Sequence, residues 1–173
     1  MTRLISMAAA AVLIAGCQTA PEGDGLRATA ALQSTKGSKA FGEATFEQVG
    51  DKVRVVVFAQ GLRPGQQHGF HIHEVGDCSS GDGMSTKGHF NPQGKPHGHP
   101  LSDARHSGDL PALFADASGR ARIDATVDLI TLQPGPTNII GRGMIIHADP
   151  DDFRTQPTGN AGARLACGVI KAG

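Results

Sequence analysis

The sequence lacks an excess of charge of either sign. Its 16 basic residues balance 16 acidic ones, and a cleaved leader of residues 1–16 would take away only Arg3. A nearly neutral chain has no general attraction to nucleic acid or to an anionic membrane surface. It also lacks any apolar run after Cys17 that approaches the roughly 20 residues needed to span a bilayer. Composition therefore argues against a nucleic-acid-binding protein and against membrane-spanning helices.

Helical periodicity and internal repeats are also missing. No segment keeps apolar residues at the 3.6-residue spacing of a capped amphipathic helix. The 24 glycines and 10 prolines instead separate short strand-like runs, and "DASG" is typical of a turn. Short strands joined by glycine-rich turns predict an all-β sandwich or barrel. The predicted strands are 26–33, 44–48, 52–59, 67–74, 109–115, 120–127, 143–147 and 163–170.

Cysteine is scarce, with three in the chain, and the first ends a segment typical of export signals. Arg3 precedes a short apolar run that ends in "LIAGC". This ending resembles a bacterial lipobox, in which a peptidase cuts before Cys17 and the thiol carries lipid. The alternative is an ordinary secretory signal in which Cys17 is incidental. Either way we expect an exported, periplasmic protein, with a signal peptide at 1–16, a lipidated cysteine and flexible tether at 17–27, and one domain at 28–173.

The other two cysteines, Cys78 and Cys167, form an even pair in a chain predicted to be exported. Such a pair is typical of a disulfide bond, which here would close a loop of about 90 residues. With the cysteines committed to lipid and to a disulfide, a zinc finger built on thiolates is not expected.

The chain has eight histidines, and seven of them lie within residues 68–106. Two stretches, 75–107 and 148–162, have no strand pattern, and long strandless loops in compact domains are usually functional or disordered. His71 and His73 would share one face of a strand, which either a bound cation or ordinary hydrogen bonding could explain. Imidazoles near a carboxylate such as Asp109 suit zinc and copper. The number of candidate ligands favours two metal ions.

Six motifs together resemble the copper–zinc superoxide dismutases, in particular the exported bacterial branch. They are "GFHIHEVGDC", "GHFNP", "HGHP", "RHSGDLP", "IIGRGMIIHADPDDF" and "GNAGARLACGVI". The likeness runs from about Thr29 to Ile170 and keeps the family's motif order. It implies an eight-stranded Greek-key β-barrel of immunoglobulin-like sandwich architecture with two long functional loops.

The resemblance implies two metal sites that share one ligand. Copper would be bound by four histidines, His71, His73, His89 and His147. Zinc would be bound by three histidines and a carboxylate, His89, His97, His106 and Asp109. His89 would then bridge the two ions as an imidazolate, with one ring nitrogen on each.

Two other histidines are implied to have different roles. In "HGHP" the family places its zinc ligand before the glycine, which selects His97 and leaves His99 in a variable, solvated position. The family uses the position of His68 for packing and hydrogen bonding, so we do not expect His68 to bind a metal.

Further roles follow from the same resemblance. Asp151 would accept hydrogen bonds from one copper-ligand and one zinc-ligand histidine. Arg164 would stand over the copper and attract the anionic substrate, and the Cys78–Cys167 disulfide would tie a loop to the strand after Arg164. Because the 148–162 loop has no lysine, we expect steering to rest on Arg164 with help from Lys87.

The resemblance predicts an enzyme that converts superoxide to O₂ and H₂O₂ by alternate reduction and oxidation of copper, with zinc in a structural role. The alternative is a non-catalytic copper- or zinc-binding lipoprotein with a dismutase-like domain. Such relatives lose copper ligands or the arginine, whereas this sequence has all of them. A purely structural β-domain would not need this density of histidine. The expected partners are the substrate superoxide and a membrane, which the protein would contact only through its lipid anchor. Bacterial members of the family differ in their oligomeric state, and a homodimer is one state open to this chain.

Overall fold

Ten strands and one 3₁₀ turn make up the regular structure of residues 25–173, the part of the chain that the computed structural model describes. The predicted signal peptide, Cys17 and most of the predicted tether lie outside these residues. Within them, no helix is long and apolar enough to cross a membrane. The elements are β1 (Arg27–Ser34), β2 (Phe41–Val49), β3 (Lys52–Gln60), β4 (Gln67–His68), β5 (Phe70–His73), η1 (Met84–Thr86), β6 (Leu113–Phe114), β7 (Ala121–Val127), β8 (Gly143–His147), β9 (Arg164–Val169) and β10 (Lys171–Ala172).

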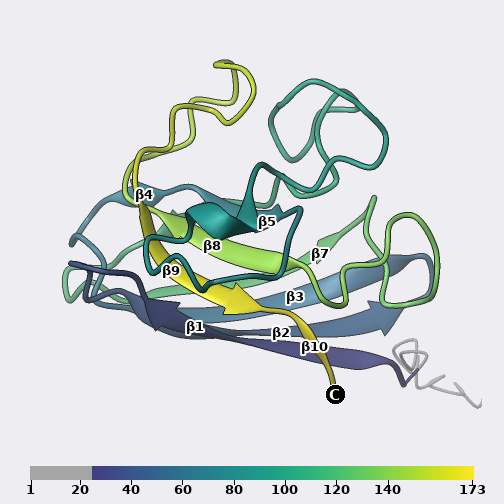
Figure 1. Ribbon diagram of the computed structural model, residues 1–173, viewed down its shortest axis with the longest axis horizontal. Coiled ribbons are helices and arrows are strands. Elements are labelled where there is room, and N and C mark those ends of the chain that lie inside the picture. The colour runs from purple at the N-terminus through teal and green to yellow at the C-terminus, as the bar shows by residue number, and fades with distance from the viewer. Residues whose placement is uncertain (1–24) are drawn as a thin grey trace, which may run out of the picture.

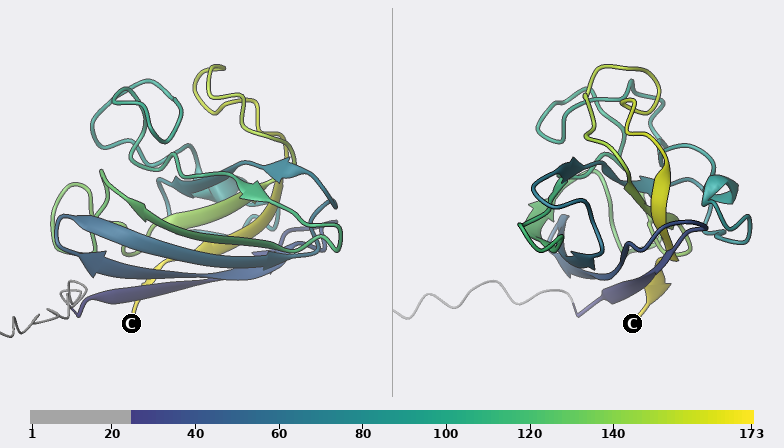
Figure 2. Two further views of the ribbon diagram at one scale, coloured as in Figure 1. Left: turned by 180° about the vertical axis from the view of Figure 1, so that it is seen from behind. Right: turned by 90° about the vertical axis from the view of Figure 1, so that its left-hand side faces the viewer.

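The strands form a strongly curled antiparallel sheet (Figures 1 and 2). Its order is β5-β8-β9-β1-β2-β3-β7, with β10 paired to β1. Consecutive strands β1, β2 and β3 form a meander, after which the chain crosses to β4 and β5 and returns through β6 to β7. The small β4–β6 pair lies between the ends of the large sheet, because β4 continues into β5 and β6 packs beside β7. This crossing connection gives the sheet the topology of the predicted Greek-key barrel.

Alternation of side chains along the strands builds the core. In β3, Val53, Val55 and Val57 are buried, while Lys52 and Arg54 are exposed. Successive side chains in a strand point to opposite faces of the sheet, so these three valines face the barrel interior, whereas Phe58 on the other face is exposed. In β5 all four residues are buried, because Phe70 and Ile72 join the core while the opposite face lies under loops.

The predicted strands match the observed ones with four main differences. The 67–74 strand is interrupted at Gly69, which separates β4 from β5 and pairs instead with Asp149 and His147. The 109–115 strand is shorter than predicted, since only β6 forms. Pro111 has no N–H for a ladder, and the carboxylate of Asp109 accepts the backbone N–H of His106. Strand β2 begins at Phe41 rather than at 44, and β10 was not predicted.

Two long loops lie together over one side of the barrel (Figures 1 and 2). They correspond to the predicted strandless stretches. The first loop returns to β5 in its middle and at its end: Phe90 N–H donates to the Ile72 carbonyl (2.8 Å), and Ile72 N–H donates to the Gly108 carbonyl (3.0 Å). Isolated bridges pair His71 with Asp109 and His73 with His89. Backbone pairing thus brings residues far apart in sequence against the histidine face of β5.

We expect Leu32→Ala to lower the free energy of unfolding by about 2–5 kcal/mol, because it leaves a cavity in a closely packed core. The side chain of Leu32 has no exposed surface, whereas that of Leu101 is 89% exposed. Leu101→Ala is the matched control and should change stability by less than about 0.5 kcal/mol. Urea unfolding measures both values. Equal effects of the two substitutions would contradict the assignment of Leu32 to the core.

Candidate metal centre

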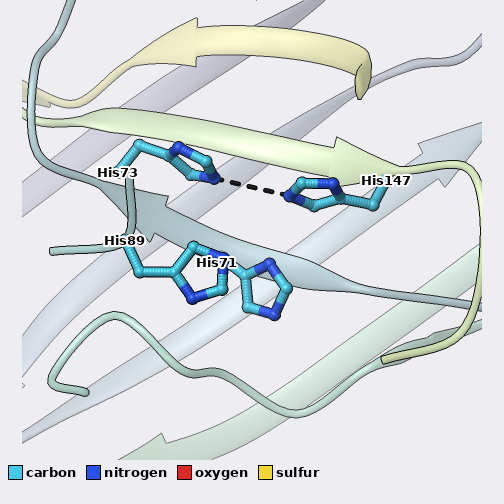
Figure 3. Close-up of side chains that lie close together, drawn as sticks. All are labelled: His71, His73, His89 and His147. Atoms are coloured by element: carbon cyan, nitrogen blue, oxygen red, sulfur yellow. Dashed lines mark hydrogen bonds between the residues drawn. The ribbon is translucent and has the colours of Figure 1, made fainter. Parts of the chain in front are cut away.

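Four histidines from two strands and a loop point their rings toward one another (Figure 3). They are His71 and His73 of β5, His147 at the end of β8, and His89 of the first long loop. One ring nitrogen from each lies within 4.8 Å of those of the others, and all four residues are buried. Strand β5 pairs with β8 in antiparallel register, which brings His147 to the side of the sheet that carries His71 and His73.

Hydrogen bonds to protein oxygens occupy the outer nitrogen of three of these rings. Since a carboxylate or carbonyl oxygen can only accept, the ring nitrogen must donate. His71 Nε2–H donates to Asp151 Oδ2 (2.7 Å), and His73 Nδ1–H donates to the Lys87 carbonyl (2.9 Å). His147 Nδ1–H makes a longer bond to the Gly162 carbonyl (3.3 Å). The remaining nitrogens, His71 Nδ1, His73 Nε2 and His147 Nε2, are left as electron-pair donors.

The four rings are held in their neutral form. Burial lowers the pKa of His73 and of His147 well below the usual value, and the charge of Arg164 adds to the effect. Burial also lowers the pKa of His71, against its hydrogen bond to Asp151, and it lowers the pKa of His89 to about 4. Neutral imidazole is the form that binds metal ions.

A second group lies directly beside the first and shares His89 with it. Its members are three histidines and one carboxylate, His89, His97, His106 and Asp109. The three Nδ1 atoms surround Asp109 Oδ1 at 2.8 Å for His89, 3.0 Å for His97 and 3.4 Å for His106. Ligand atoms of a tetrahedral zinc ion lie roughly 3.3 Å apart at the usual bond lengths. The spacing of this group fits such an ion.

The carboxylate of Asp109 is fixed by the backbone. Its Oδ2 accepts the N–H groups of His106 (2.9 Å) and Gly98 (3.1 Å). Burial would raise the pKa of Asp109, but hydrogen bonds from the surrounding histidines outweigh burial and hold it far below the usual range. Asp109 is therefore ionised and contributes a negative charge to the second group.

Asp151 connects the two groups from the 148–162 loop. Its Oδ2 accepts from His71 of the first group, and its Oδ1 accepts from His97 Nε2 of the second group (2.9 Å). Burial lowers the pKa of His97, but its hydrogen bonds to Asp109 and Asp151 outweigh burial and raise it to about 9. Gly159 has a φ of +66° and packs so closely that a Cβ there would overlap the Asp151 carboxylate. This close approach requires glycine at position 159.

Arg164 lies beside His147, with which it pairs between β9 and β8. Its Nη1 donates to the Gly83 carbonyl (2.6 Å) and to Thr86 Oγ1 (2.8 Å), and its Nη2 donates to the Lys87 carbonyl (2.6 Å). The Lys87 carbonyl therefore accepts from both His73 and Arg164. Lys87 has a φ of 60°, which is uncommon for a residue other than glycine. Burial lowers the pKa of Arg164, yet a guanidinium stays charged at any physiological pH.

The Cys78–Cys167 disulfide joins the first long loop to β9. It lies between the chain segment that supplies the three acceptors of Arg164 and the strand that carries Arg164. The prediction of this pairing is confirmed. The bond therefore helps to hold the arginine against its acceptors.

Comparison with known proteins identifies the family that has this arrangement. A family model described as copper/zinc superoxide dismutase (SODC) matches residues 40–170. The chain belongs to the copper/zinc superoxide dismutase family. Cu-Zn superoxide dismutase 2 of Aquifex aeolicus (strain VF5) is 39% identical over 150 residues, which cover 84% of this chain and 87% of the relative. The Cu-Zn superoxide dismutase of Paramecium bursaria Chlorella virus 1 is 43% identical over 135 residues, covering 75% and 71%.

A solved structure has a similar fold. The crystal structure of the clock protein EA4 superposes with a TM-score of 0.77 at 45% sequence identity, covering 84% of this chain and 93% of that one. As a family member, the chain is an oxidoreductase, and copper and zinc are its cofactors.

The side chains of the two groups fit these two metals. His71 Nδ1 and His89 Nε2 are buried without a hydrogen-bond partner, and a buried lone pair is costly to leave unsatisfied. His73 Nε2 and His147 Nε2 face each other at 3.4 Å, although both are acceptors in the tautomers set by their other bonds. Four imidazoles suit copper, and three imidazoles with a carboxylate suit zinc.

Two histidines lie outside both groups. His68 is fully buried and donates through Nδ1 to the His147 carbonyl (2.8 Å), in agreement with the packing role expected for it. His99 accepts the Leu101 N–H through Nδ1 (3.1 Å), and its ring edge contacts Phe153. The second group therefore contains His97 rather than His99.

Several residues that support the site have no signal in the sequence. They act through backbone carbonyls, which every residue has, and they include Gly83, Lys87 and Gly162. Thr86 and Gln156 contribute side chains, but a lone polar residue in a loop is usually solvated. Their roles follow only from the contacts.

Replacing both Cys78 and Cys167 with serine should lower the free energy of unfolding by about 2–5 kcal/mol, because a constraint on the unfolded chain is lost. The half-cystines are 89 residues apart, so the released loop is long. Urea unfolding with and without a reductant checks the effect: the reductant should destabilise the wild-type protein and leave the double variant unchanged. A loss below 1 kcal/mol would contradict a stabilising role.

Proposed function

We propose that the chain dismutates superoxide at a copper ion that shares His89 with a zinc ion. The observation that carries this proposal is the membership of His89 in both groups. Its Nδ1 lies 2.8 Å from Asp109, while its Nε2 points into the four-histidine group and has no other partner. An imidazole has two nitrogens that can serve separate partners, which supports a bridging role for this ring.

The proposed ligands follow the two groups. Copper would be held by His71 Nδ1 and by the Nε2 atoms of His73, His89 and His147. Zinc would be held by the Nδ1 atoms of His89, His97 and His106 and by Asp109 Oδ1. Asp151 would keep one histidine of each set in its tautomer, an arrangement common around metal-bound imidazoles.

Bound copper supplies the redox chemistry, in which one superoxide is oxidised to O₂ and a second, with two protons, is reduced to H₂O₂. The chain would supply one of these protons at His89 Nε2: with Nδ1 on zinc, the ring would take up a proton at Nε2 while that nitrogen is not bound to copper, and it would pass the proton to the product. Its Nδ1 would meanwhile remain the zinc ligand next to Asp109. Only an imidazole combines these two tasks in one side chain.

Arg164 would bind and guide the substrate. Three oxygen acceptors hold its guanidinium beside His147 and His73, so its charge is fixed in place. Superoxide offers almost no surface for shape recognition, and a fixed cation attracts it by charge alone.

We also propose that the domain is exported and anchored by lipid at Cys17, with residues 1–16 as the signal peptide and 17–27 as the tether. The lipobox-like sequence supports this proposal. The disulfide supports export as well, since such bonds persist mainly in oxidising compartments such as the periplasm.

Histidine substitutions test the ligand sets. His73→Ala should abolish dismutation while zinc remains bound, because it removes one of four copper ligands and none of the zinc ligands. His97→Ala should lower zinc occupancy, whereas His99→Ala is the matched control and should leave it near the wild-type value. Metal analysis of the purified proteins, alongside superoxide consumption, measures these outcomes.

Full dismutation by the His73→Ala variant would refute the copper assignment. Loss of zinc in His99→Ala with retention in His97→Ala would reverse the zinc assignment. A wild-type protein that binds both metals but consumes no superoxide would instead be the non-catalytic metal-binding lipoprotein.

Arg164→Glu should reduce the rate of dismutation roughly ten- to several hundred-fold without changing the metal content. Opposite unit charges about 4 Å apart attract by about 1 kcal/mol in water and about 4 kcal/mol near a protein surface, and each 1.4 kcal/mol is about tenfold in rate. Added salt should slow the wild-type enzyme, because it screens the attraction.

Arg63→Glu makes the same change in net charge at an exposed position outside the site, and it should have a small effect. The rates are measured as a function of ionic strength. A wild-type rate for Arg164→Glu at low salt would remove Arg164 from the proposed role.

A further inference from the structure

The backbone of His97 lies in a segment without regular structure, between Pro96 and Gly98. No strand or helix supplies hydrogen bonds to the N–H and carbonyl of His97, yet buried backbone groups need hydrogen-bond partners. The His97 N–H donates to Gln156 Oε1 (2.8 Å), and Gln156 Nε2–H donates to the His97 carbonyl (2.9 Å). One side-chain amide thus satisfies both backbone groups of His97, as a paired residue in an antiparallel ladder does. We call this pair of hydrogen bonds the carboxamide bridge.

Gln156 is itself held in place by its own loop. Asp152 N–H donates to the Gly159 carbonyl (2.9 Å), and Gly159 N–H donates to the Thr155 carbonyl (2.7 Å). The Asp152 carboxylate accepts the N–H groups of Arg154 and Thr155 and the Thr155 hydroxyl. These bonds close residues 152–159 into a compact unit. The loop that carries Gln156 is therefore ordered by its own hydrogen bonds, which lowers the entropy cost of forming the carboxamide bridge.

The same loop contacts the first long loop around His97 and His99, here called the zinc-ligand loop, at three points. Asp151 accepts from the His97 ring, Gln156 bonds the His97 backbone, and Phe153 packs against His99 with ring centroids 4.7 Å apart. His97 is thereby fixed through its ring and through its main chain by residues of one segment. Asp109 holds the other side of the ring.

We propose that Gln156 is a positioning residue for the zinc site: its carboxamide bridge fixes the backbone of His97, slows zinc release, and couples the 148–162 loop to the zinc-ligand loop. The inference rests on the proposed assignment of His97 to zinc. A bound ion needs its ligand in one place, and the two bridging hydrogen bonds remove the freedom that a coil segment between Pro96 and Gly98 would otherwise have.

The test measures how fast zinc leaves the copper- and zinc-loaded protein when excess chelator and a zinc indicator dye are added. Gln156→Ala removes both hydrogen bonds and should speed zinc release about 3- to 30-fold, in line with the effect of other partners that support metal ligands. Gln156→Glu keeps an acceptor for the His97 N–H but loses the donor to the His97 carbonyl. Its zinc release rate should therefore lie between those of the wild-type protein and Gln156→Ala. Gln93→Ala, at an exposed turn of the zinc-ligand loop, is the matched control and should release zinc at the wild-type rate.

Two further readouts separate positioning from general stability. Copper release should be unchanged in Gln156→Ala, and cobalt bound in place of zinc should show an altered visible spectrum in that variant and an unaltered one in Gln93→Ala. Equal acceleration of copper and zinc release, or an equal effect of Gln93→Ala, would overturn the positioning role. So would a zinc release rate in Gln156→Ala within twofold of wild type.

The His97→Ala variant distinguishes a failure of this inference from a failure of the proposed function. If His97→Ala loses zinc while Gln156→Ala releases it normally, only the carboxamide bridge is refuted. If His97→Ala retains zinc, the ligand assignment itself is wrong, and the inference about Gln156 fails with it.

Discussion

The four-histidine group depends on hydrogen bonds that occupy the outer ring nitrogens of His71, His73 and His147. Each bond fixes a tautomer and leaves the opposite nitrogen free toward the centre of the group. The acceptors are a carboxylate and two main-chain carbonyls from the two long loops. The strands set the positions of the rings, but the loops decide which atoms are available to a metal. The site is complete only when both loops pack against the barrel.

His97 lies where the two loops meet, between two ionised carboxylates. Burying Asp109 and Asp151 is costly unless their charges are paired and hydrogen-bonded, and the histidines provide both. Because Asp151 also bonds His71, a displacement of the 148–162 loop would disturb both proposed ligand sets at once. The Gln156 bridge adds a main-chain connection to the same point. Asp151 therefore supports both groups, whereas Gln156 bonds only the His97 segment.

On the side of the site where Arg164 lies, one backbone group also serves two residues. One carbonyl, that of Lys87, accepts from the His73 ring and from the Arg164 guanidinium. The uncommon backbone conformation of Lys87 turns this carbonyl toward both donors, and the Cys78–Cys167 disulfide holds the loop near β9. The distance between the proposed substrate-binding cation and one proposed copper ligand is thus set through a single peptide group.

Local patterns in the sequence determined much of this protein. Alternating apolar residues predicted the strands, the His71/His73 spacing placed two rings on one face of β5, and the quoted motifs indicated the family and the disulfide. Only the tertiary structure decided that 109–115 is mostly loop, that Gly69 divides a strand, and that Gln156 bonds His97. Strand periodicity and family motifs are recorded in neighbouring residues. No local pattern predicts that a backbone carbonyl will accept from a site residue, or that the Gln156 amide will bond His97 from 59 residues away. These contacts form only when the whole chain has folded.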